Sequence, residues 1–143
     1  MSLAFNAWLA GAAALSALAA LLHLGCIAFG PAWYRAFGAG ERLARPAERG
    51  SPVPTLATLA IASVLALWAA YAASGAGLLP RLPWLRGVLC VIAAIYLLRG
   101  LAGLPMMLSM PGRSTAFWLW SSATCIGIGL VHVAGLRQGW SQL

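Results

Sequence analysis

Apolar and polar positions alternate along this chain in long blocks. Four apolar runs, each long enough for the roughly 20 residues of a membrane-spanning helix, are separated by polar or proline- and glycine-rich stretches. The pattern predicts an all-α membrane protein with four transmembrane helices in an antiparallel bundle. The expected spans are residues 3–30, 53–73, 84–110 and 114–136. Together they use nearly the whole chain, so residues 1–143 are expected to form a single integral membrane domain.

The polar loop 31–52 holds both carboxylate side chains of the protein, Glu41 and Glu48. Aromatic residues beside Arg35 predict an anchor at the level of the lipid headgroups. Two glycines permit a sharp turn just before Glu41. A short interfacial helix from Glu41 to Glu48 is expected to follow, ended by glycine and proline.

The third apolar run contains a charged residue, Arg99, near its middle, and Pro105 lies six residues later. Because proline has no N–H and crowds the carbonyl four residues back, a kink is expected between Leu101 and Pro105. A charge at this depth costs roughly 2.5–3.5 kcal/mol on insertion scales, and it rarely faces lipid. Arg99 is therefore expected either to have a buried partner or to serve a ligand.

Composition excludes a soluble domain. Of 143 residues, 62% are hydrophobic and only 8% are charged, against roughly 25% charged residues in soluble domains. The net charge of +7 is the balance of nine arginines and two glutamates. Most of the arginines lie at the ends of the apolar runs, and this placement indicates a role in membrane anchoring and topology rather than in nucleic-acid binding. Their distribution favours cytoplasmic 31–52 and 111–113 loops and periplasmic termini. The arginine-, alanine- and glycine-rich composition is typical of a bacterial protein, so we expect the inner membrane.

Polar side chains concentrate in the half of the bilayer beneath loop 31–52. At about 1.5 Å per helical residue, His23 lies roughly 10 Å and Arg99 roughly 16 Å inside that face. A planar guanidinium suits bidentate binding of a carboxylate or phosphate. The sequence thus predicts a one-sided polar pocket that binds an anionic ligand or lipid headgroup. Its expected residues are Arg99, His23, Glu41, Thr55, Thr58 and Ser121.

A structural role for Arg99 stays open as an alternative to ligand binding. Glu41, Tyr96 or backbone carbonyls could accept hydrogen bonds from its guanidinium, and Arg99 would then only fix helix packing. No cofactor or metal is expected. His23 and His132 differ in depth by roughly 17 Å and cannot share a haem, and no cluster has zinc or iron spacing. The three cysteines form no CxxC pair. Catalytic motifs are missing as well, since there is no aspartate and no GxSxG.

Three functions follow from these patterns. The first is the binding or translocation (transport) of a small anionic or amphipathic molecule through the Arg99 pocket. The second is a non-catalytic accessory or assembly subunit of a larger membrane complex, in which the polar residues only hold the helices together. The third is a membrane enzyme acting on a lipid. The expected partners are the bilayer, an anionic ligand or headgroup, and further copies or subunits.

Overall fold

The computed structural model describes residues 4–109 and 114–143, and within these the chain is helical with no strands. The long helices are α1 (Ala7–Phe29), α4 (Val53–Gly75), α5 (Leu85–Ser109) and α6 (Thr115–Gly139). Each is long and apolar enough to cross a membrane. Two short helices, α2 (Pro31–Ala36) and α3 (Glu41–Glu48), connect α1 to α4. The predicted all-α fold with four spans is confirmed, and the protein is a small multi-pass membrane protein.

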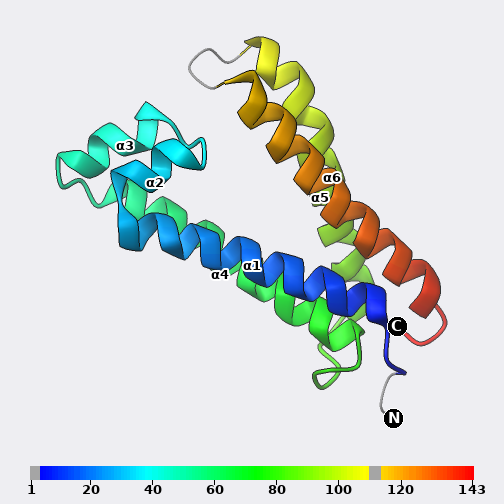
Figure 1. Cartoon of the computed structure of the whole chain (residues 1–143). Coiled ribbons are helices and arrows are strands. Elements are labelled where there is room, and N and C mark those ends of the chain that lie inside the picture. Colours follow the sequence, from blue (N-terminus) through cyan, green and yellow to red (C-terminus); the bar gives the residue numbers. More distant parts are fainter. Residues whose placement is uncertain (1–3, 110–113) are drawn as a thin grey trace.

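The four spans form two antiparallel hairpins, α1 with α4 and α5 with α6 (Figure 1). The hairpins meet where α1 begins and α6 ends, and they diverge toward the opposite end, which carries α2 and α3 (Figure 1). At the meeting point Leu9 of α1 packs on Gly135 of α6 and reaches Gly75 of α4, which also lies against Leu89 of α5. The bundle is therefore closed at one end only.

Small residues allow the helices to approach closely. A Cβ on Gly135 would lie 2.6 Å from Leu9 Cγ, and one on Gly129 would lie 2.8 Å from Leu97 Cγ. Such contacts are typical of membrane helices, whose association depends on packing because lipid is as apolar as leucine. The outer faces remain apolar. In each span only 28% to 33% of the most hydrophobic window is buried, so most of its side chains face outward, where hydrocarbon surrounds them.

The α2–α3 unit is fixed to the first hairpin. Tyr34 of α2 and Ala44 of α3 are buried in a small apolar cluster with Cys26 of α1, and Thr58 of α4 donates to the Tyr34 hydroxyl at 3.2 Å. The turn between α2 and α3 contains Gly38, with φ 76°. The helix expected from Glu41 to Glu48 is confirmed.

A capping residue marks the start of the fourth span. Ser114 is the N-cap of α6, and its hydroxyl accepts a hydrogen bond from the Phe117 N–H at 3.2 Å. In α5 the helix continues through Pro105 to Ser109. The carbonyl of Leu101 cannot receive a bond from proline, so the turn between these residues is the weak point of the helix.

Candidate functional site

Arg99 lies in the contact between α5 and α6 and is half-buried. Its Nη2 donates to the hydroxyl of Ser121 at 3.1 Å, and its guanidinium lies over the ring of Trp118, 5.6 Å from the centroid. Both partners are on α6, within the two turns that follow its N-cap. Of the residues predicted for the pocket, the structure therefore brings Arg99 and Ser121 together.

The guanidinium lies closer to the membrane face than the backbone of Arg99 does. Its Nη1 is 3.4 Å from the position that a Cβ would take on Gly103, one turn further along α5. Gly103 is six residues before the end of α5 at Ser109, which places the charge about 9 Å from that helix end. The side chain thus extends toward the headgroups, as long basic side chains in spans commonly do.

The expected ion pair between Arg99 and Glu41 is not formed. Glu41 instead accepts two hydrogen bonds from Arg35, at 2.7 and 3.2 Å, and one from Arg45 at 3.2 Å. Arg35 also pairs with Glu48 at 2.7 Å. The physical reason is local: α3 places Arg45 one turn after Glu41, and the glycine turn brings Arg35 back onto the same carboxylate. The hydrogen bonds from Arg35, and to a smaller extent the one from Arg45, hold the pKa of Glu41 below its usual range. The hydrogen bonds to Glu41 and Glu48 in turn raise the pKa of Arg35.

Arg99 is consequently a cation without a carboxylate partner in the described part of the chain. The protein has only two carboxylate side chains, and both are engaged at the interface. In residues 4–109 and 114–143, Arg99 Nη1 is buried with no hydrogen-bond partner, and so is the hydroxyl of Ser122. Both atoms lie beside Gly103. Buried polar atoms without partners are uncommon, and each costs about 1–3 kcal/mol.

The remaining predicted residues lie on the other hairpin. His23 of α1 bonds through Nδ1 to the Ala19 carbonyl at 2.7 Å. Thr58 is buried against Tyr34, while Thr55 lines a cavity of about 360 Å³ at the junction of α1, α2, α3 and α4. Because the hairpins diverge at this end (Figure 1), the six predicted residues do not form one pocket in this structure.

A buried polar group at the crossing of the four helices was not predicted. Ser16 of α1 and Tyr96 of α5 share a hydrogen bond of 3.0 Å. The Tyr96 ring packs against Trp68 of α4 at 5.0 Å and against His132 of α6 at 5.5 Å between centroids. His132 is fully buried, and its Nε2 has no partner among the described residues. The sequence does not indicate that the helix faces carrying Ser16, Tyr96 and His132 meet.

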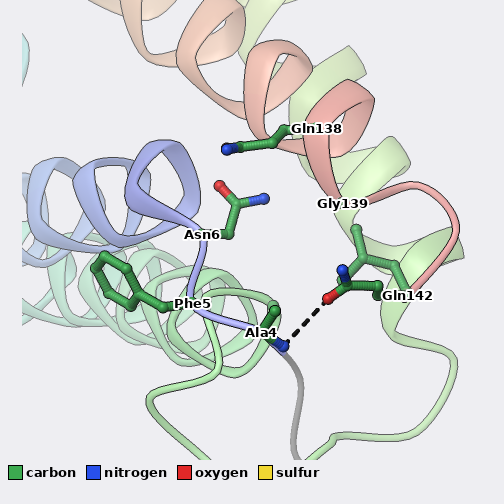
Figure 2. A pocket seen from close by; sticks show the side chains of 8 residues that line it. Ala4, Phe5, Asn6, Gln138, Gly139 and Gln142 are labelled. Carbon is green, nitrogen blue, oxygen red and sulfur yellow. Dashed lines mark hydrogen bonds between the residues drawn. The ribbon is translucent and has the colours of Figure 1, made fainter.

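A second cavity, of about 300 Å³, opens where the hairpins meet (Figure 2). Asn6 lines it, capping α1 through its Oδ1 and donating to the Gly135 carbonyl at 2.8 Å. The Gln142 side chain accepts from the Ala4 N–H at 3.1 Å, and Gln138 points toward Asn6 (Figure 2). The lining of this cavity contains none of the residues predicted to bind a ligand and no charged side chain.

Within the described residues, no three side chains of His, Cys, Asp or Glu converge in a way that could hold a metal ion. Comparison of the chain with models of protein families, with curated proteins and with solved structures found no match.

Proposed function

We propose that this membrane protein binds an anionic amphiphile whose phosphate or carboxylate group is accepted by Arg99. The observation that carries the proposal is the charge balance: Arg99 lies inside a span, and both carboxylates of the chain are engaged elsewhere. A membrane-embedded guanidinium requires a counter-charge, and phosphate or carboxylate matches its planar fork.

The surroundings of Arg99 support an anion rather than a neutral ligand. Nη2 is held by a single hydroxyl, Nη1 has no partner in the described residues, and the Ser122 hydroxyl beside it is also unpaired. An anionic oxygen could accept from both unpaired groups after a small shift of the side chains. The guanidinium lies about 9 Å from the end of α5, a depth that a lipid headgroup reaches when the bilayer thins locally around a buried charge.

The test compares binding of anionic and zwitterionic lipids to the purified protein by native mass spectrometry. The probes are phosphatidylglycerol, phosphatidylcholine and, without lipid, inorganic phosphate. Wild type is expected to prefer phosphatidylglycerol, and Arg99→Ala is expected to bind it about 10- to 100-fold more weakly, because hydrogen bonds to charged groups contribute about 1.5–3 kcal/mol. Binding of inorganic phosphate alone would instead identify a free anion as the ligand.

Arg86→Ala is the matched control. Arg86 also lies over an indole ring, that of Trp140 at 4.9 Å, but it is at the start of α5 and exposed. Its loss is expected to leave the lipid preference unchanged. Equal binding of phosphatidylglycerol by wild type and Arg99→Ala would refute the proposal. Loss of a co-purified, stoichiometric membrane protein from Arg99→Ala would support an accessory subunit, with a carboxylate of that partner as the counter-charge.

We also propose that α2 and α3 lie on the cytoplasmic side of a bacterial inner membrane. Support comes from the distribution of arginines: Arg35, Arg42, Arg45 and Arg49 are at this end of the spans, against Arg81, Arg86 and Arg137 at the other. A reporter fused after Leu143 tests the orientation. Activity of a reporter that works only in the periplasm is expected, and activity of a strictly cytoplasmic reporter would reverse the assignment.

A further inference from the structure

The two hairpins touch again at the end where they diverge. Gly38, in the turn between α2 and α3, packs directly against the ring of Phe117 in the first turn of α6, and a Cβ at this glycine would overlap the ring. Gly38 also has a φ of 76°, which side-chain-bearing residues rarely adopt. The turn therefore has both the shape and the missing side chain that this contact requires.

Two aromatic rings connect this contact to Arg99. Phe117 packs edge-to-face on Trp118, with 5.5 Å between the centroids. Trp118 is only 2% exposed and lies beneath the Arg99 guanidinium. Phe117 is half-buried, and its ring packs against one side of Trp118, so a displacement of Phe117 changes the support of the ring on which the guanidinium lies.

The α2–α3 unit is built to hold the turn in place. On one side Trp33 stacks on Phe29 at 4.5 Å and contacts Phe37 at 5.2 Å, which fixes α2 to the end of α1. On the other side Arg35 bonds to Glu41 and to Glu48, the two ends of α3. The turn that carries the glycine is thus held between two helices that are cross-linked to each other.

We propose that α2–α3 is a lid on the Arg99 site, latched by the packing of Gly38 on Phe117. The inference rests on the proposed binding of an anionic lipid at Arg99 and concerns how that site is reached. With the latch closed, the lid bridges the hairpins on the headgroup side of Trp118. Release of the latch frees Phe117 and opens a route from the headgroup layer to the guanidinium.

The chain offers matched controls for the latch. Gly30 and Gly50 have φ of 70° and 72°, nearly that of Gly38, but a Cβ at either would meet nothing within 4 Å. Alanine is strained by the positive φ at all three positions, and only Gly38→Ala also collides with Phe117. Phe117→Ala opens the latch from the opposite side without straining the turn.

The experiment measures exchange of fluorescent phosphatidylglycerol on the purified protein in nanodiscs. Gly38→Ala and Phe117→Ala are each expected to exchange lipid about tenfold faster than Gly30→Ala and Gly50→Ala. Overpacking in Gly38→Ala and loss of the ring contact in Phe117→Ala each cost at least about as much as a tenfold change in an equilibrium. The double variant Gly38→Ala/Phe117→Ala should exchange no faster than Phe117→Ala, because the ring that collides is gone. Exchange by Gly38→Ala at the rate of the two control glycines would overturn the lid.

Hydrogen–deuterium exchange separates failure of the lid from failure of the site. Gly38→Ala is expected to increase exchange in residues 31–50 and in the first turn of α6, relative to Gly30→Ala, and this readout needs no ligand. If Arg99→Ala retains lipid but these amides still exchange faster in Gly38→Ala, the proposed function fails while the latch contact stands. If Arg99→Ala loses lipid and the amides do not respond, the binding site stands and the lid is wrong.

Discussion

Replacing Gly100 by alanine tests the closeness of the α5–α6 contact beside Arg99. A Cβ at this position would lie 2.5 Å from Ile126 Cγ1 and 3.0 Å from two backbone atoms of α6, the Ile126 nitrogen and the Ser122 oxygen. The isoleucine side chain can rotate away, but backbone atoms cannot. Ordinary van der Waals contact of a Cβ begins at 3.4 Å, so the helices must separate locally by a few tenths of an ångström, about 0.4 Å.

The magnitude follows from comparison with Gly87, on the same helix, where a Cβ would meet nothing within 4 Å. Alanine gains about 0.5–1 kcal/mol of helix propensity over glycine at either position. This gain cancels in the difference between Gly100→Ala and Gly87→Ala. What remains is the cost of overpacking, about 1–3 kcal/mol. Gly87→Ala itself should be neutral or slightly stabilising.

Unfolding in mixed micelles, titrated with dodecyl sulfate and followed by far-UV circular dichroism, measures both free energies. Gly129→Ala and Gly127→Ala repeat the comparison on α6, because a Cβ on Gly129 would lie 3.2 Å from the backbone nitrogen of Leu97, whereas one on Gly127 would meet nothing within 4 Å. If both members of each pair unfold within about 0.5 kcal/mol of one another, which is the usual size of a neutral substitution, the close packing of α5 on α6 is refuted.

Three further predictions concern other contacts. Tyr96→Phe and Ser16→Ala should each destabilise the crossing of the helices, and their double-mutant cycle should show a coupling of about 0.6 kcal/mol, the average for hydrogen bonds within a membrane; full additivity would exclude the bond. Glu41 contributes stability to α2–α3 above its unfolded pKa, and because its folded pKa is lowered, the contribution is lost as pH falls below about 4.3. Hydrogen exchange of residues 31–50, taken relative to the rest of the chain, should then increase, whereas in Glu41→Gln it should be increased at every pH. Ser114→Ala should destabilise α6 by about 1 kcal/mol through loss of its N-cap, and Thr115→Ala should not.

Local sequence signals were sufficient for the elements of this fold. Apolar run length placed all four spans, and the observed helices end within a few residues of the expected bounds. Glycine before Glu41 and glycine and proline beyond Glu48 placed α3. Run length acts through the transfer of apolar side chains into lipid, and the glycine and proline signals act through the backbone within one or two turns, so tertiary contacts change neither.

The site was predicted only in part, because it depends on which helix faces meet. Arg99 and Ser121 do lie together, but His23, Thr55 and Thr58 belong to the other hairpin. The sequence gives only the position of each residue along its own helix. Depth alone, however, treats the four helices as one closed bundle, whereas the hairpins diverge at the end that carries these residues (Figure 1).

The sequence by itself determined the class of the protein, the ends of its helices and the excess of nine arginines over two carboxylate side chains. Tertiary structure alone decided that Glu41 pairs with Arg35. It also decided that Tyr96 contacts both Ser16 and His132, and that the glycine turn between α2 and α3 packs against α6. The physical reason is the solvent. In lipid every outward face is as apolar as the packed one, so hydrophobic periodicity does not identify the contact face, and close steric fit between small residues selects it instead.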